Sequence, residues 1–167
     1  MRRAPAPNDY DGWVSQLGVS SSRQRAKAHL VTAGPPALPA LRRGLVHRKA
    51  IVRQLCVRLF DQLVDEASLP DLVLALEDED LGVRTRAMHA LACDRCKQDA
   101  CRPAEDVWVP MALDWLNDPD PDLRASAIDA LGKVAGHRPE VGEALAAASE
   151  RDPDQGLRSM ARRRARV

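Results

Sequence analysis

Aromatic side chains are scarce in this sequence, and long apolar runs are absent. The 167 residues include three Trp, one Tyr and one Phe, or 3% of the chain, whereas 45% of the residues are hydrophobic. The core must therefore consist mainly of Leu, Val and Ala, which favours close-packed helices over a pleated sheet. No run is long and apolar enough for a membrane span, and no apolar stretch follows the basic N-terminus as in a secretory signal. We expect a single-domain cytoplasmic protein.

Recognisable catalytic patterns are also missing. The sequence has no Ser/His/Asp set, no glycine-rich phosphate loop and no H-E-x-x-H motif. Paired acids such as those at 77–80 fall in an expected inter-helix turn, where solvent prevents the separation of pKa values that a catalytic carboxylate pair needs. We therefore expect that the protein is not an enzyme.

The net charge of +1 conceals a strong segregation of charge. Residues 1–60 carry +9, residues 61–157 carry −13, and residues 158–167 carry +5. Such asymmetry is typical of proteins that bind nucleic acid or an acidic partner, or that associate with themselves. Ordinary solvated helix faces are the simpler explanation.

A step of one apolar residue and one Arg recurs along the chain, each time with a small residue three positions later. The copies are Val52-Arg53…Cys56, Val83-Arg84…Ala87, Leu123-Arg124…Ala127 and Leu157-Arg158…Ala161, with Arg23…Ala26 as a weaker fifth. The arginines lie 30 to 40 residues apart, a period typical of stacked supersecondary units. Acidic residues precede three of the steps as candidate helix caps. Each step lies at the start of one helix, and another apolar helix precedes that helix in the chain. Each unit is therefore predicted to be a helical hairpin.

The segments LVTAGPPALPALRRGL and LNDPDPDLRASAIDALGKVAG resemble HEAT repeats of the short bacterial kind, which also occur in phycocyanobilin-lyase-like proteins. The resemblance implies an all-α solenoid of about five helical hairpins whose second helices line a concave face. It also implies that Arg53, Arg84, Arg124 and Arg158 pair with acids in neighbouring turns. We expect a flexible segment at 1–12 and one HEAT-repeat domain at 13–167, with a Cys-rich insertion at 93–103.

The insertion contains the one constellation that the repeat does not explain, His89, Cys93, Cys96 and Cys101. His89 and Cys93 are four residues apart on one expected helix, so they are neighbours on its surface. One nitrogen and three sulfurs at these spacings suit tetrahedral zinc, and a closed set of four ligands would be structural. The alternatives are an iron–sulfur cluster, a redox pair and reduced cysteines without a ligand. We expect Cys56 to be a buried small residue outside this set.

Three classes of function remain open from the sequence. The first is a scaffold or adaptor that binds a protein through its concave helical face, using the candidate residues Arg58, Arg86, Met88, Lys133, Arg162, Arg163 and Arg164. The second is nucleic-acid binding, similar to HEAT-like DNA glycosylases, through the basic N-terminal region and the Arg-rich C-terminal helix. The −13 middle and the scarcity of aromatic residues argue against it. The third is a chaperone-like lyase for a tetrapyrrole.

Overall fold

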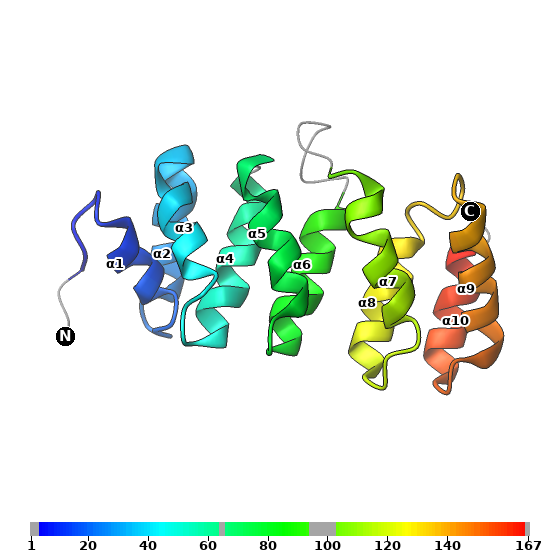
Figure 1. Cartoon of the computed structure of the whole chain (residues 1–167). Coiled ribbons are helices and arrows are strands. Elements are labelled where there is room, and N and C mark those ends of the chain that lie inside the picture. Colours follow the sequence, from blue (N-terminus) through cyan, green and yellow to red (C-terminus); the bar gives the residue numbers. More distant parts are fainter. Residues whose placement is uncertain (1–3, 64–65, 94–102, 166–167) are drawn as a thin grey trace.

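The chain forms a row of helical hairpins stacked side by side, with the two termini at opposite ends (Figure 1). This computed structural model describes residues 4–63, 66–93 and 103–165. Within those ranges it contains α-helices and short 3-10 turns but no strand. The α-helices are α1 (Tyr10–Gln16), α2 (Arg23–Ala33), α3 (Leu38–Gly44), α4 (Ala50–Leu63), α5 (Leu69–Leu74), α6 (Leu81–Ala92), α7 (Val109–Trp115), α8 (Pro121–Leu131), α9 (Pro139–Arg151) and α10 (Gln155–Arg164). The predicted all-α solenoid is confirmed.

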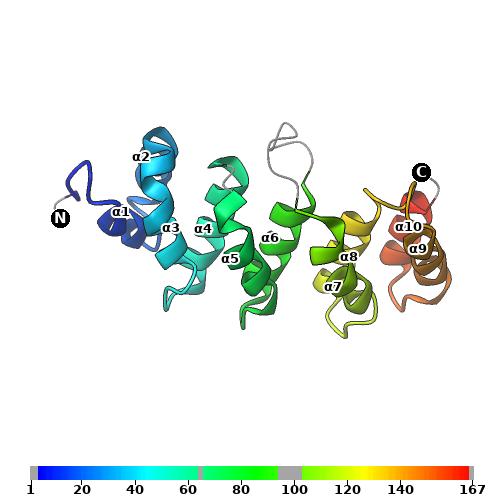
Figure 2. The same ribbon diagram turned by 45° about the horizontal axis from the view of Figure 1, so that its top comes forward.

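The helices are arranged in two rows, which Figure 2 shows from a second direction. The second helices α4, α6, α8 and α10 pack extensively against one another along the stack. Of the first helices, α5, α7 and α9 pack mainly against helices of the second row, whereas α3 packs against both α1 and α4. In a curved stack the inner row has the closer spacing, so the second helices form the inner side. The exposed faces of α4, α6 and α8 therefore lie on the inner side of the stack.

The small residue of each repeat allows this close spacing. Each lies three positions after its step arginine and has 0% of its surface exposed: Ala26, Cys56, Ala87, Ala127 and Ala161. Any larger side chain there would push adjacent helices apart. The larger side chains of the core come mostly from Leu and Val, as the scarcity of aromatic residues predicted, and all three tryptophans are buried as well.

Short acidic turns begin the second helices. Asp80 accepts a hydrogen bond from the Val83 amide at 3.0 Å, and Asp154 accepts one from the Leu157 amide at 2.9 Å. Asp120 similarly accepts from the Asp122 amide at 2.8 Å. Each carboxylate satisfies a first-turn amide that the helix leaves without a partner, which stabilises the helix by about 1 kcal/mol. The predicted caps are confirmed at all three turns.

The step arginines share one contact in all five copies. Each donates to the backbone carbonyl six residues before it, at 2.6 to 2.9 Å: Leu17 from Arg23, His47 from Arg53, Asp78 from Arg84, Asp118 from Arg124 and Asp152 from Arg158. This bond ties the second helix to the turn that precedes it. It explains why the arginine recurs even in the weak first copy.

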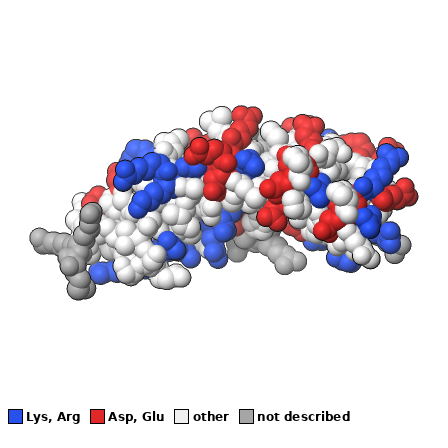
Figure 3. Space-filling view, turned by 90° about the horizontal axis from the view of Figure 1, so that it is seen from below, with Lys and Arg blue, Asp and Glu red and all other residues white. Residues whose placement is uncertain are grey.

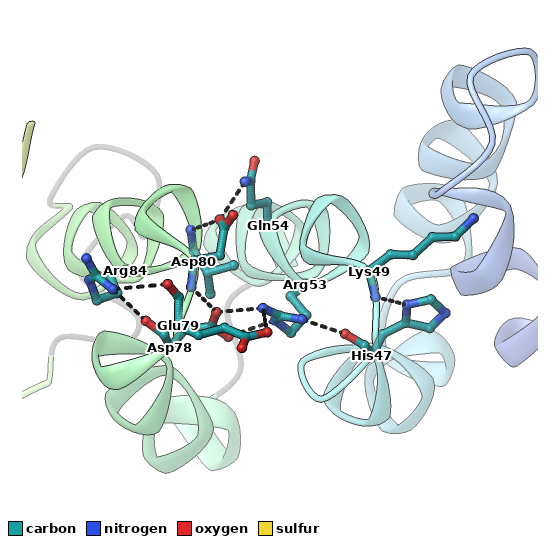
Figure 4. Close-up of polar contacts among 9 residues, drawn as sticks. His47, Lys49, Arg53, Gln54, Asp78, Glu79, Asp80 and Arg84 are labelled. Carbon is teal, nitrogen blue, oxygen red and sulfur yellow. Dashed lines mark hydrogen bonds and ion pairs between the residues drawn. The ribbon is translucent and has the colours of Figure 1, made fainter.

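Two of these arginines also reach the turn of the next hairpin. Arg53 donates to both carboxylate oxygens of Asp78 at 2.8 Å, as Figure 4 shows, and this hydrogen bond raises the pKa of Arg53. Arg124 donates to Asp152 at 2.9 and 3.3 Å. Such bidentate pairs fix both distance and orientation between adjacent hairpins. The predicted pairing between repeats is confirmed at these two positions.

The pairing prediction is wrong for Arg84 and Arg158. Within the described residues both contact only carbonyl groups of their own turn. Arg158 belongs to the last hairpin that the structure describes. Arg84 precedes the junction that contains the insertion, where the arginine spacing widens to 40 residues. The ladder of ion pairs is therefore interrupted where the repeat is interrupted.

The N-terminal residues that the structure describes pack against the first hairpin. Trp13 donates from Nε1 to the Ala6 carbonyl at 2.9 Å, and His29 Nε2 lies 2.7 Å from the Pro7 carbonyl oxygen. The His29 ring stacks on Trp13 with 4.3 Å between centroids. The domain boundary that we placed at residue 13 therefore falls inside α1.

Candidate functional site

A groove of about 650 Å³ lies between α4 and α6 on the inner side of the stack. It is lined by Arg58, Asp61 and Gln62 from α4 and by Gly82, Thr85, Arg86 and His89 from α6. All seven are polar or lack a side chain. The groove is therefore a hydrophilic recess.

Two arginines at this groove keep their charge available. Arg58 is exposed and forms no ion pair or hydrogen bond with any described residue, and Arg86 makes one long contact, 3.5 Å to Gln54 Oε1. By contrast, Arg43 and Arg138 on the molecular surface are held by carboxylates at 2.7 to 2.9 Å. The guanidinium groups of Arg58 and Arg86 can therefore receive carboxylates from outside the chain.

Three possible metal ligands meet at the edge of the same groove. Asp61 comes from α4, His89 from α6, and Cys93 ends α6 as its C-terminal cap. One ligand atom of each lies within 4.8 Å of the others, and His89 Nε2 is 3.9 Å from Asp61 Oδ2. His89 is exposed, whereas Asp61 and Cys93 are buried. The cluster can hold a cation, because all three side chains can donate an electron pair to it.

The sequence-based metal set is only partly within the described residues. His89 and Cys93 come together as their i, i+4 spacing predicted. Cys96 and Cys101 lie outside the described residues, so their part in the set stays a prediction. Asp61 was not in that set, because its distance of 28 residues from His89 gives no local motif.

A signal for Asp61 was nevertheless present in the repeat. The position eight residues after the step arginine is Ala92 in the Arg84 copy and Gly132 in the Arg124 copy, both buried. The Arg53 copy has Asp61 there, with 8% of its surface exposed. An acid where sibling repeats need a small residue indicates a local function, and aligning the copies over a longer stretch would have found it.

The remaining candidate partner residues divide by burial. Met88 has 0% of its surface exposed, so it belongs to the core and its assignment to the partner surface is wrong. Arg164 is bonded to Asp129 on α8, and Lys133 is half-buried beyond the end of α8. Arg162 and Arg163 are exposed at the far end of the stack. Arg58 and Arg86 are therefore the two candidates that share one recess.

The charge on the turn side of the molecule follows the sequence segregation. In Figure 3, Lys and Arg gather toward the N-terminal end and again at the C-terminal end, and Asp and Glu recur along the middle. Asp78 and Asp152 in this acidic region are neutralised by Arg53 and Arg124. Part of the negative charge of residues 61–157 is therefore neutralised by ion pairs between adjacent hairpins.

Cys56 is separate from the metal cluster, as predicted. Its side chain is fully buried, and burial raises the pKa of its thiol to about 12. Because the thiolate is the reactive form, almost none is present near neutral pH. In a variant with Cys93, Cys96 and Cys101 replaced by Ser, we expect no labelling by a thiol reagent at pH 8 in the folded state and one label per chain in denaturant. Rapid labelling of the folded variant would contradict this burial.

The comparisons with known proteins identify the repeat. Residues 100–165 match the family model of HEAT repeats. A chain in the complex of CpcE and CpcF of phycocyanin lyase from Nostoc sp. PCC7120 superimposes with a TM-score of 0.76 at 18% identity, over 93% of this chain and 96% of that one. An engineered protein superimposes with a TM-score of 0.57 at 20% identity, over 94% of this chain and 77% of that one. No curated protein sequence matches the chain.

The expectation that the protein is not an enzyme is corrected by the first of these structures. A solenoid of the same fold is part of a lyase complex. The lack of a familiar catalytic motif therefore did not exclude enzymatic activity, because a curved repeat surface can position reactants without one.

No described helix combines the length and apolar character that a membrane span requires. The match at residues 100–165, the shared fold and the step arginine recurring along the stack agree with one another. Residues 100–165 therefore match HEAT repeats, and the described chain as a whole has the architecture of an α-solenoid.

Proposed function

We propose that the protein is a scaffold that binds a partner protein in the groove between α4 and α6. The observation that carries the proposal is the pair of arginines there, Arg58 and Arg86, which no described carboxylate neutralises. By contrast, the repeat arginines Arg53 and Arg124 are held by acids of the next turn. Charges left unpaired in a recess favour a ligand that brings the opposite charge.

The chemistry of the groove indicates the kind of partner. A guanidinium group binds a carboxylate through two parallel hydrogen bonds, and Gln62 and Thr85 add neutral donors and acceptors in the same groove. An acidic segment of a protein, extended or helical, fits this set. The similar chain from Nostoc comes from a complex of two proteins, CpcE and CpcF, which supports a protein as the partner.

Charge reversal at the groove tests the proposal. We expect Arg58→Glu/Arg86→Glu to lose the partner that the immobilised wild-type chain retains from extract of its source cells, because close charge pairs become repulsive. The matched control is Arg48→Glu/Arg151→Glu, which makes the same change in net charge at exposed positions outside the groove. Retained proteins are compared by mass spectrometry, and circular dichroism checks that both variants fold. Equal loss by both variants, or by neither, would contradict the groove as the binding site.

The same region is proposed to hold zinc. His89 lines the groove, and Cys93 lies close to it at the groove edge. An imidazole nitrogen together with a cysteine thiolate is common among the ligands of zinc sites. In the four-residue set predicted from the sequence, Cys96 and Cys101 would complete the coordination. Bound zinc would stabilise the end of α6, next to the surface proposed to bind the partner.

A further inference from the structure

We propose that Asp61 on α4 is a zinc ligand together with His89 and Cys93, so that the ion joins two adjacent hairpins. This inference rests on the zinc proposal above and changes its ligand set. A set drawn only from α6 and the insertion would hold the insertion to its own helix. A set that includes Asp61 instead connects α4 to α6 across the floor of the groove.

One oxygen of the Asp61 carboxylate lacks a partner among the described residues. The residue is 8% exposed, and its Oδ1 atom is fully buried without a hydrogen-bond donor in the part of the chain that the structure describes. Buried polar atoms are nearly always bonded, and an exception in a native fold indicates an ion or water at that place. His89 Nε2, 3.9 Å from Oδ2, is beyond hydrogen-bonding distance and does not satisfy Oδ1. A cation between the two side chains would satisfy the carboxylate.

The spacing of the three ligand atoms is close to that of a bound metal. Ligands at about 2.0–2.3 Å from a tetrahedral ion lie about 3.4 Å apart. The observed atoms lie within 4.8 Å of one another, and one pair is at 3.9 Å. The His89 side chain is exposed, so it can rotate toward the other two ligands. The backbone already brings the three residues together.

The donor set selects the metal. One carboxylate oxygen, one imidazole nitrogen and one thiolate sulfur suit zinc, whereas Mg²⁺ and Ca²⁺ prefer oxygen alone. When Zn²⁺ binds, Cys93 releases its thiol proton to solvent, and the two anionic ligands balance the charge of the ion. The net charge of the site is then zero, so the desolvation cost at this half-buried place is low.

The location of the cluster gives zinc a mechanical role. The Arg53–Asp78 pair joins the two hairpins near the start of α4, and Asp61 lies at the other end of that helix. Zinc would therefore fasten the second end of the same helix pair. Asp61 and His89 both line the groove, so the distance between Arg58 and Arg86 across it would depend on whether the metal is bound.

The test measures zinc binding by the full-length chain after removal of metal with a chelator under reducing conditions. We expect one Zn²⁺ per chain, a rise in melting temperature on adding Zn²⁺, and a thiolate-to-metal absorption band with Co²⁺. In Asp61→Asn the affinity for Zn²⁺ falls at least about 100-fold, since even outer-shell changes cost 10- to 100-fold. The matched controls Asp114→Asn, at an exposed position of α7, and Cys56→Ala keep wild-type affinity.

Folding of the variant is checked separately. Asp61→Ala carries the residue found at the same position of the Arg84 copy, so the metal-free variant is expected to melt no lower than the metal-free wild type. Its melting temperature no longer rises with Zn²⁺. A variant that is folded yet unresponsive to zinc separates loss of a ligand from loss of structure.

The outcomes distinguish this inference from the zinc proposal on which it rests. If the wild type binds no zinc, both fail. If the wild type binds zinc and Asp61→Asn binds it equally well, the assignment of Asp61 fails alone. Loss of zinc in Cys96→Ser/Cys101→Ser with unchanged binding in Asp61→Asn would assign the ion to the four-residue set instead.

Discussion

Replacing Asp152 by Asn is expected to lower the free energy of unfolding by about 3–5 kcal/mol. The Asp152 and Arg124 side chains are 2% and 7% exposed, and they form a bidentate pair between adjacent hairpins. The amide keeps the size of the carboxylate but loses its charge, which leaves a buried guanidinium without a counter-charge. Because so little solvent reaches the pair, we expect the loss to persist at high salt.

Asp118→Asn is the matched control for this substitution. Asp118 has the same place in its turn and accepts from the Asp120 amide at 2.8 Å, as Asp152 does from Asp154. Asp118 forms no ion pair with Arg84, the preceding step arginine. The expected loss in free energy of unfolding is therefore about 1 kcal/mol, the typical contribution of one hydrogen bond. Urea denaturation followed by circular dichroism measures both variants. Similar losses for the two would show that the pair between hairpins adds no stability beyond the turn itself.

Met88→Ala is expected to lower the free energy of unfolding by about 2–5 kcal/mol. Met88 has none of its surface exposed and lies in the core of the stack. Truncation removes buried apolar surface and leaves a cavity that the surrounding helices cannot fully close. Urea denaturation of the two proteins, fitted with a common slope, measures the difference.

Arg86→Ala, two positions earlier on the same helix, is the matched control for Met88→Ala. Its exposed side chain contributes no core packing, so the expected change is within about 0.5 kcal/mol. If Met88→Ala proved equally neutral and instead weakened partner binding, Met88 would belong to the binding surface after all.

The regular part of the fold could be predicted from the sequence because each repeat needs the same local contacts. The step arginine recurs since its bond to the carbonyl six residues earlier is made in all five copies. The acidic caps recur since each second helix begins in a short turn with unsatisfied amides. Such contacts depend on a few neighbouring residues, and they leave a period in the sequence.

Contacts between hairpins were harder to predict. Whether Arg84 reaches the next turn depends on how two hairpins stack. Because the repeat spacing is interrupted at that junction, the sequence did not predict the distance between Arg84 and the next turn. Met88 was misplaced because a second helix in a solenoid is packed by its own hairpin and by both neighbours. Its buried face is therefore wider than the stripe that a 3.6-residue period predicts. Residues flanking that stripe need the structure to assign them.

The candidate site shows the same division. Arg58 and Arg86 could be predicted as exposed positions of second helices, but not that they share one groove in which no described carboxylate pairs with them. The cysteine spacing predicted only ligands that are close in sequence. It did not predict Asp61, which comes from the preceding hairpin. A site formed by two repeats leaves no local sequence motif. Comparison of equivalent positions in the repeats nevertheless identifies a residue such as Asp61 that differs from its counterparts.

Site-specific photocrosslinking tests the central claim most directly, namely that the groove between α4 and α6 is the face that binds a partner. Gln62 lines the groove, and Asp114 is exposed on α7 in the other row of helices. A photoreactive amino acid is placed at one position or the other, and crosslinked products in the source cells are compared. We predict a discrete crosslink to another protein from position 62 and none from position 114. A crosslink from position 114 with none from position 62 would contradict the account.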